Sequence, residues 1–486
     1  MLRSLNKKYI AQLFVEVPRF ARLIARSMVI LYFVVLVLLA MLSDGMPLLT
    51  AGRVAAVGLM LILSCWPLLF SMPGVGFLHP LYFLSAYGFV KGTLLDLPGY
   101  AFGLETHPAL PTLRPFEIGK LQIEAILLDA LAWLMIYAGF RIAKGFSWRS
   151  LQFHEKPQLE FWGAVLAYIL GMLSFVLLVQ VSGGFEQHLK NIARGMDAKV
   201  FVGNPQFAST YAFLVTLTMI APALLLLKKR DAARRPLFWL LALSSSVLLL
   251  LVNGRRSAIL RPTLLFLTCW VHRNGRLPIF SMVVIAIVLL LSIGVVGEYR
   301  RSNWSSPSNR VNFDAVTDLN LEQAFQLSLG EIQTRREGGP IYPIIYRVPS
   351  EIPFLYGMNY FDYIKRFTPR ILWPTKPRGI GVDCARTFYG VTYAIPPGPL
   401  GEAYWSGGPL GVAIVFFLWG MLLKSLFKFF LRFHQSSIAC LLYLMTLAML
   451  TPDETGFRSW SFLFVPTVSL LFATGMLTVR TGIKVG

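Results

Sequence analysis

Long apolar runs without a single charged residue are the feature that most constrains the fold of this chain. With their flanks these runs reach about 20 residues, which is the length that a helix needs to cross the hydrocarbon core of a bilayer. A membrane β-barrel would instead show alternating stretches of about 10 residues. We therefore predict an all-α, polytopic membrane protein, in which each spanning helix satisfies its own backbone hydrogen bonds. Examples of the runs are Ile30–Met41, Val54–Phe70, Phe280–Val295 and Val412–Leu423.

The composition excludes a chain that is water-soluble over its whole length. Hydrophobic residues make up 56% of the 486 residues and charged residues only 14%, against about 45–50% and about 25% in soluble domains. The net charge of +21 would point to nucleic acid in a soluble protein. In a membrane protein the same excess belongs to short cytoplasmic loops, which accumulate lysine and arginine. We therefore expect a membrane lipid environment and no nucleic acid partner.

The charges of the loops predict an orientation for about twelve spans. The N-terminal tail is basic and is expected in the cytoplasm. We expect no cleavable signal peptide, because the first apolar segment is long enough to span and no small-residue cleavage site follows it. The expected location is the bacterial inner membrane, with these basic loops on the cytoplasmic side: 141–156, 228–235, 273–276, 424–432 and the C-terminal tail. The predicted spans are 27–44, 52–71, 77–95, 120–140, 161–182, 208–227, 237–252, 257–271, 277–297, 409–427, 438–451 and 459–479.

One very long segment, 298–408, is predicted to lie on the opposite, periplasmic face. It divides the chain into nine spans in 1–297, the periplasmic loop itself, and three spans in 409–486. A loop of this length is uncommon and usually functional. Asn320 followed by Gln323 resembles a capping box, and apolar residues at helical spacing follow it. We therefore predict an amphipathic helix within the loop.

Two groups of cationic residues are predicted to lie on the periplasmic face, where loops carry fewer lysines and arginines than on the cytoplasmic face. Arg255 and Arg256 form a tight turn between two spans, and the segment 183–203 carries Lys190 and Arg194. Guanidinium groups match the oxygen geometry of phosphate, so an anionic ligand would explain their position. The alternatives are a pair of arginines that snorkel at the interface and an ordinary solvated loop.

The long loop also contains a segment, 356–377, in which aromatic and basic residues alternate. Tyr356, Arg370 and Lys376 are the members that we single out as candidate substrate-binding residues. Aromatic faces and hydrogen-bonding groups together suit a sugar, because the C–H faces of sugars pack on rings. The alternative is an aromatic belt at the membrane interface.

Glu402 is the candidate general base. It lies between glycines, beside Tyr404 and just before a predicted span. A carboxylate among apolar neighbours near the membrane can act as a base. The alternative is a loop carboxylate that pairs with a nearby arginine, and Asp362 and Asp383 would then be the remaining candidate bases.

Several kinds of site are missing from the sequence. It contains no P-loop, which argues against an ATP-driven pump, and no cluster of cysteine and histidine with metal-ligand spacing. We therefore expect no metal and no cofactor. Asp453 and Glu454 are expected to form a local ion pair with Arg458.

The motifs in 180–415 resemble those of the Wzy-type O-antigen and oligosaccharide repeat-unit polymerases. In that family a Gly-Gly pair is followed by a basic segment, and residues 183–194 of this chain match that pattern. A Gly-x-Arg turn that opens the next span matches Gly254-Arg255-Arg256, with Arg256 in the family's arginine position. The remaining matches are Tyr356-Gly357, Pro369-Arg370, Trp373-Pro374, Lys376-Pro377 and the Gly-Glu-x-Tyr stretch Gly401–Tyr404.

The resemblance implies a membrane glycosyltransferase that joins undecaprenyl-pyrophosphate-linked oligosaccharide repeat units at the periplasmic face. Arg256, Arg255 and Arg194 would stabilise the departing pyrophosphate, and Glu402 would take the acceptor proton. The implied partners are polyprenyl-pyrophosphate-linked oligosaccharides, with a chain-length regulator as a further candidate.

Three alternatives stay open at this point. The similar O-antigen ligases typically carry an important histidine in the large loop, and 298–408 has none. A flippase or transporter of lipid-linked oligosaccharide would be expected to show internal repeats and broken helices, and the sequence shows neither clearly. A polysaccharide-assembly subunit without catalysis is the third alternative.

Overall fold

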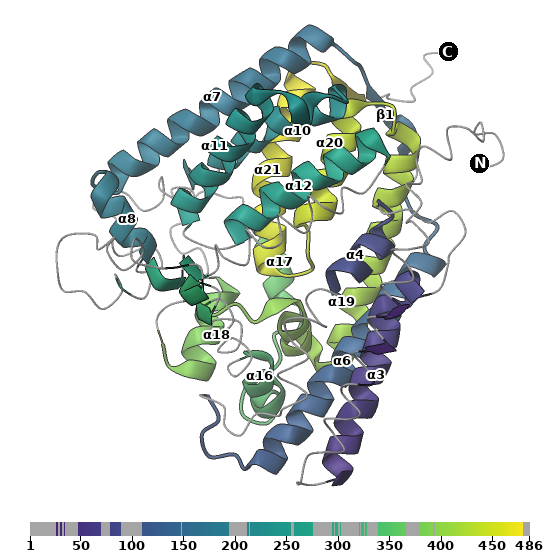
Figure 1. Ribbon diagram of the computed structural model, residues 1–486. Coiled ribbons are helices and arrows are strands. Elements are labelled where there is room, and N and C mark those ends of the chain that lie inside the picture. Colours follow the sequence, from purple (N-terminus) through teal and green to yellow (C-terminus); the bar gives the residue numbers. More distant parts are fainter. Residues whose placement is uncertain are drawn as a thin grey trace. The chain divides into compact units, whose positions relative to one another are not determined.

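The computed structural model describes a mostly helical chain (Figure 1). Its contacts divide the chain into two compact units that alternate along the sequence. Unit 1 comprises 1–146, 332–428 and 451–457, and unit 2 comprises 147–331, 429–450 and 458–486. The residues that the structure describes are 26–27, 30–31, 34, 47–69, 78–88, 109–146, 148–193, 211–212, 214–253, 257–275, 294–295, 297–299, 302, 320, 322–324, 326–327, 339–365, 379–391 and 394–479.

Apolar helices of membrane-spanning length confirm the predicted helical class. Four helices are long and apolar enough to cross a membrane, and several shorter apolar helices accompany them. The predicted segments 27–44 and 277–297 lie largely outside the described residues. The four long helices are Ala51–Leu69 within α3, Pro115–Ile142 (α6), Pro157–Val181 (α7) and Gly398–Phe433 (α19). The shorter ones are Val215–Lys228, Pro236–Val252, Ser437–Met449 and Leu463–Ala473.

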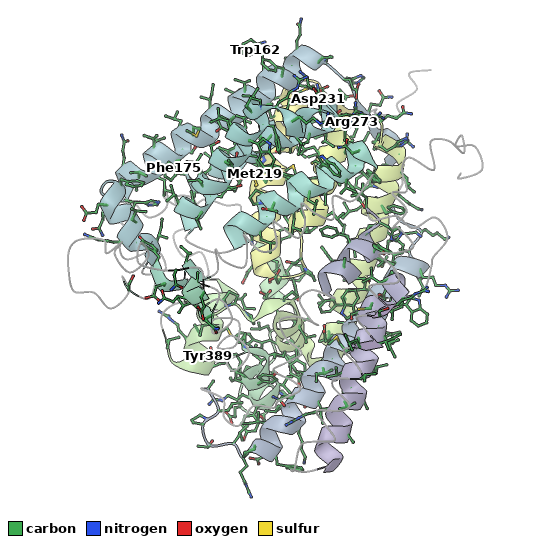
Figure 2. The ribbon with its side chains drawn as sticks, in the orientation of Figure 1. Trp162, Phe175, Met219, Asp231, Arg273 and Tyr389 are labelled. Carbon is green, nitrogen blue, oxygen red and sulfur yellow. The ribbon has the colours of Figure 1, made fainter. Side chains whose placement is uncertain are left out.

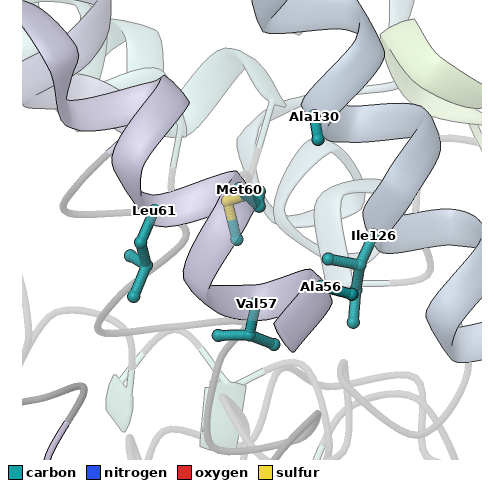
Figure 3. Packing of buried hydrophobic residues seen from close by; sticks show 6 residues of the cluster. All are labelled: Ala56, Val57, Met60, Leu61, Ile126 and Ala130. Atoms are coloured by element: carbon teal, nitrogen blue, oxygen red, sulfur yellow. The ribbon is translucent and has the colours of Figure 1, made fainter. Parts of the chain in front are cut away.

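In unit 1, α3 (Pro47–Leu69) and α6 run parallel to each other. A Cβ on Gly52, near the start of α3, would lie 3.2 Å from Ile123. Further along both helices, the Tyr137 hydroxyl donates a 2.8 Å hydrogen bond to the carbonyl oxygen of Leu63. Because the contacts advance together along both helices, α3 and α6 share one direction. Figure 3 shows the buried cluster between these two contacts, which consists of Ala56, Val57, Met60, Leu61, Ile126 and Ala130.

The helix α19 also runs parallel to α6. Glu124 interacts electrostatically with Tyr404 near the start of both helices, and Lys428 donates to the carbonyl oxygen of Lys144 near their ends. Between these ends the backbones approach closely, as membrane helices do where small residues meet. The two residues at this crossing, where a Cβ would meet the backbone of the other helix, are Gly139 and Gly420.

The described part of the predicted loop 298–408 is largely folded into short helices. Asn320 and Gln323 form the predicted capping box: the Gln323 N–H lies 2.7 Å from Asn320 Oδ1, and the Asn320 N–H lies 3.2 Å from Gln323 Oε1. The last part of this predicted loop is also helical, because α19 begins at Gly398. The other loop helices are α16 (Ile341–Arg347), α17 (Met358–Lys365) and α18 (Ile380–Tyr389).

A break divides α19 into two helical pieces. Gly407 and Gly408 have non-helical backbone angles, and the φ of 63° and ψ of −149° at Gly408 are accessible only to glycine. The first piece packs on α16, since a Cβ on Gly401 would lie 3.1 Å from Ile344. This packing explains a helix in a stretch rich in glycine and proline, where intrinsic propensity favours a loop. The second piece resumes at Pro409, where the predicted span begins.

Unit 2 is a helical bundle joined at one end by polar contacts. The ends of α10 and α12 are linked by a 3.2 Å hydrogen bond from Arg273 to the carbonyl oxygen of Lys228. Lys228 also forms an ion pair with Glu160, in the first turn of α7. At the same end, β1 (Leu151–Phe153) pairs antiparallel with β2 (Leu477–Val479). The helices of this bundle are α7, α8 (Phe185–Ala193), α10 (Ile220–Lys228), α11 (Pro236–Asn253), α12 (Ser257–Asn274), α20 (Ser437–Met449) and most of α21 (Glu454–Ala473).

Large apolar side chains lie exposed along α7 and α11 (Figure 2). Trp162 of α7 is 64% exposed and Leu240 of α11 is 67% exposed. Exposed apolar faces of this extent mark contact with a membrane or with another protein. Their continuation along a helix of membrane-spanning length is typical of lipid contact.

Candidate functional site

Glu402 lies in a buried polar cluster of unit 1. It occupies the first piece of α19 and has no exposed surface. Ser406, one turn later, places its hydroxyl oxygen 2.8 Å from the Glu402 carbonyl oxygen and 2.9 Å from Oδ1 of Asn359. Asn359 comes from α17, so this hydroxyl joins the loop helix to α19. The contact is reinforced nearby, because the Leu355 N–H donates a 2.9 Å hydrogen bond to the carbonyl oxygen of Trp405.

Asp453 contributes a second buried carboxyl group to this cluster. Its Oδ1 accepts a hydrogen bond of 3.0 Å from the Gly456 N–H and another from the Thr451 hydroxyl, so Asp453 caps the start of α21. The predicted ion pair with Arg458 stays a prediction, because the side chains of Glu454 and Arg458 lie outside the described residues.

The hydroxyl of Tyr360, on α17, lies among these groups. Burial raises the pKa of Tyr360 above its ordinary value, and the negative charges of Glu402 and Asp453 raise that pKa further. Ser406 and Asn359 lie beside the same hydroxyl. Tyr360 therefore keeps its proton at neutral pH and can donate a hydrogen bond to a carboxylate or to a substrate oxygen.

The cluster still offers an unsatisfied polar atom. Within the described part of the chain, Nδ2 of Asn359 is buried without a hydrogen-bond partner. Buried N–H groups are normally paired, so such a donor is available to a polar ligand. The cluster thus combines two acids, an unbonded amide N–H donor and a protonated phenol, which is a suitable set for orienting hydroxyl groups.

The two tyrosines predicted to bind substrate differ in exposure. Tyr356 is 77% exposed and has a φ of 48°, an uncommon conformation for a residue other than glycine. Tyr404 is only 6% exposed. The ring of Tyr356 is therefore accessible at the surface of unit 1, whereas Tyr404 belongs to the packing of α19.

The described part of the predicted cationic segment, 183–193, belongs to unit 2. Gly183 and Gly184, with φ of 88° and 99°, turn the chain between α7 and α8. Lys190 forms a 3.3 Å ion pair with Glu186, one turn earlier on α8, and its side chain is only 13% exposed. Part of the positive charge predicted for substrate binding is thus balanced within the helix.

His188 ties α8 to the end of α11, and the sequence analysis did not single it out. Its Nε2 lies 2.9 Å from the Leu251 carbonyl oxygen, which can only accept, so Nε2 carries the proton. Nδ1 lies 2.9 Å from the Ser182 hydroxyl. Burial lowers the pKa of His188, although the bond to Leu251 opposes this shift. The neutral ring therefore holds α8 beside the last turn of α11, which ends at Asn253.

The structure brings some predicted site residues together and leaves others undescribed. Glu402, Tyr404 and Tyr356 belong to unit 1, and Lys190 belongs to unit 2. Arg194, Arg255, Arg256, Arg370 and Lys376 lie outside the described residues. Within unit 2, the bond from His188 to Leu251 holds α8, which carries Lys190, at the last turn of α11.

Among the described residues, no group of three or more histidine, cysteine or acidic side chains is arranged to hold a metal ion.

Models of known protein families, curated proteins and solved structures were all compared with this chain, and none of them matches it.

Proposed function

We propose that the protein is a membrane glycosyltransferase that polymerises polyprenyl-pyrophosphate-linked oligosaccharide repeat units at the outer face of a bacterial inner membrane. The observation that carries the proposal is the full burial of Glu402 among Asn359, Tyr360, Ser406 and Asp453. This glutamate belongs to the Gly-Glu-x-Tyr stretch that resembles the polymerase family. A buried acid surrounded by hydroxyl-orienting groups suits the activation of a sugar hydroxyl.

The reaction would proceed by direct displacement. The hydroxyl oxygen of the acceptor sugar attacks the anomeric carbon of the donor, and the bond from that carbon to the pyrophosphate oxygen breaks. The bonding electrons leave with polyprenyl pyrophosphate, the acceptor proton goes to the Glu402 carboxylate, and the anomeric configuration inverts. The roles of Arg256, Arg255 and Arg194 would be to stabilise the charge on the departing pyrophosphate.

Helix directions support the predicted alternation of spans. The predicted spans 52–71, 120–140 and 409–427 are the second, fourth and tenth, so all three should cross the membrane in one direction. Their helices α3, α6 and α19 do run parallel. The antiparallel pairing of β1 with β2 likewise joins the predicted cytoplasmic loop 141–156 to the C-terminal segment.

A transporter of lipid-linked oligosaccharide is the second candidate function. The break of α19 at Gly407 and Gly408 favours it, because discontinuous helices are common at transporter substrate sites. The same break also allows Glu402 to sit on a separate helical piece, so it fits both functions. The two candidates differ in chemistry, because a transporter moves its substrate without forming a glycosidic bond.

The decisive experiment incubates the purified protein with a lipid-linked repeat unit and separates the products by size. A polymerase gives a ladder spaced by one repeat unit and releases one polyprenyl pyrophosphate per bond formed. A ligase would transfer a glycan once to a different acceptor, and a transporter would leave the substrate unchanged. We expect Arg256→Ala to abolish the ladder at unchanged protein level. Arg256→Lys should also fail substantially, since a point charge does not replace a bidentate fork.

A further inference from the structure

Two side chains of unit 1, one fully buried and one half-buried, carry buried polar atoms without the hydrogen-bond partners that such atoms normally have. They are Arg53 of α3 and Gln122 of α6. Gln122 has no exposed surface, and within the described part of the chain neither Oε1 nor Nε2 makes a hydrogen bond. The Nε of Arg53 is likewise buried and unbonded. An unsatisfied buried polar atom costs about 1–3 kcal/mol, and a charged group costs more.

The parallel packing of α3 and α6 places these two side chains beside each other. Arg53 lies one turn before Val57, and Gln122 lies one turn before Ile126. Val57 and Ile126 belong to one buried cluster (Figure 3). Residues one turn apart share a helix face, so Arg53 and Gln122 occupy the next level of the same interface.

The loop helix α16 provides a third wall. Its residue Tyr342 is buried and interacts electrostatically with Arg53, and α16 packs on α6. Among the described residues, no carboxylate forms an ion pair with Arg53. The guanidinium of Arg53 and the carboxamide of Gln122 thus lie on the faces of packed helices, and the Arg53 Nε and both polar atoms of the Gln122 amide have no hydrogen-bond partner among the described residues.

We propose that Arg53 and Gln122 bind the phosphate groups of a lipid-linked glycan. An anion would supply the charge that Arg53 lacks and would accept hydrogen bonds from both side chains. Arg53 lies at the start of α3, the end that the loop charges assign to the outer face, where positive charge is not favoured.

The identity of this lipid rests on the proposed function. Polymerisation joins two lipid-linked molecules, so two pyrophosphate groups are present and only the donor's departs. The acceptor's pyrophosphate stays intact and needs its own site. Arg53 and Gln122 lie in the same unit as Glu402, which takes the acceptor proton. α16 also connects the two places, because Ile344 packs against Gly401, the neighbour of Glu402. The site therefore holds the acceptor.

The test measures the binding of polyprenyl pyrophosphate to the purified full chain in nanodiscs. Arg53→Ala should weaken binding at least tenfold, which corresponds to about 1.4 kcal/mol, and Arg53→Lys should restore it only in part. Gln122→Leu should weaken binding several-fold and at the same time raise thermal stability, because it removes an unpaired buried amide. Arg141→Ala, at the exposed opposite end of α6, is the matched control and should leave binding unchanged.

Competition identifies the source of the phosphate. Inorganic pyrophosphate should compete only weakly with polyprenyl pyrophosphate for the site, and phosphatidylglycerol should compete poorly. If phosphatidylglycerol competed as well as unlabelled polyprenyl pyrophosphate, the assignment would be overturned in favour of bulk lipid. Unchanged binding in both Arg53→Ala and Gln122→Leu would overturn the site itself. A ladder from the wild-type protein with normal binding in both variants would refute this site alone. Loss of binding in the variants without any wild-type ladder would uphold the site and refute the polymerase.

Discussion

Glu402 has no exposed surface, so its carboxyl group can exchange a proton only with the groups that surround it or with a substrate that reaches it. The surrounding groups are suited to this exchange. Tyr360 stays protonated, because burial and two nearby negative charges raise its pKa. Asp453 is occupied in capping α21. Glu402 is therefore the carboxyl group of the cluster that is best placed to act as a base.

Replacing Glu402 with glutamine should remove most turnover while the fold and donor binding persist. A general base contributes about 10²–10⁴-fold to the rate. The base must be ionised, so the wild-type turnover rate should fall as the pH decreases. This fall is the acidic limb of the profile of rate against pH, and it should vanish in Glu402→Gln. The measurement is the product ladder as a function of pH.

Asp383→Asn changes one of the two remaining candidate bases, an exposed carboxylate on α18, and should leave the profile unchanged if Glu402 is the base. A near-normal rate with an unchanged acidic limb in Glu402→Gln would remove Glu402 from the mechanism. Reduced thermal stability together with weaker substrate binding would indicate that Glu402 only holds the loop in place.

Single residues also show where prediction from sequence ends. Glu402 could be singled out because glycines and aromatic residues flank it within one stretch. Asn359, Ser406 and Asp453 could not, because they meet only after three separate segments fold together. His188 had a local signal, a Gly-Gly pair before a basic helix, but its role depends on Leu251, 63 residues away.

At the scale of helices, the break in α19 decides where Glu402 lies. The predicted span 409–427 begins at Pro409, and the helix does resume there. The helical piece before the break was not predicted, because tertiary packing on α16 outweighs the poor helix propensity of its glycines and prolines.

Gly408→Ala should destabilise the protein and reduce turnover. The left-handed φ of 63° is unfavourable for alanine, and its Cβ would lie 3.3 Å from the ring of Phe354. We expect a cost of about 1–3 kcal/mol, measured as a lower unfolding temperature. The control is Gly163→Ala within α7, where a Cβ would meet no atom within 4 Å. This control should be neutral or stabilising, by up to about 1 kcal/mol. Equal stability of the two variants would contradict the described break.

Substituting either partner of the ion pair between α7 and α10 should lower the free energy of unfolding, but by different amounts. The Glu160 side chain is 2% exposed and the Lys228 side chain 33%. Lys228→Met leaves a buried carboxylate unpaired, so we expect a loss of about 3 kcal/mol in unfolding free energy. Glu160→Gln leaves a partly hydrated ammonium group, so we expect about 1 kcal/mol. The double variant should cost less than the sum, because the partners are coupled. Additive costs in unfolding titrations would refute the pairing.

At the scale of the whole molecule, apolar runs and loop charges were sufficient to predict helices and a common direction for α3, α6 and α19. They could not predict the two compact units. Unit 1 draws on 1–146, 332–428 and 451–457, and unit 2 takes the segments between and after them. Such alternation depends on contacts between distant segments, such as β1 with β2, which short apolar patterns do not encode.

Every functional assignment depends on one claim, that the basic loops and the polar clusters lie on opposite sides of the membrane. The most direct measurement fuses, at Lys228 and at Ser308, a reporter that is active only outside the cytoplasm. We predict no activity at Lys228, which contacts Arg273 and Glu160 at the ends of neighbouring helices, and strong activity at Ser308, in the predicted long loop. Activity at Lys228 would contradict the orientation, and with it the placement of Glu402 and Arg53 at the outer face.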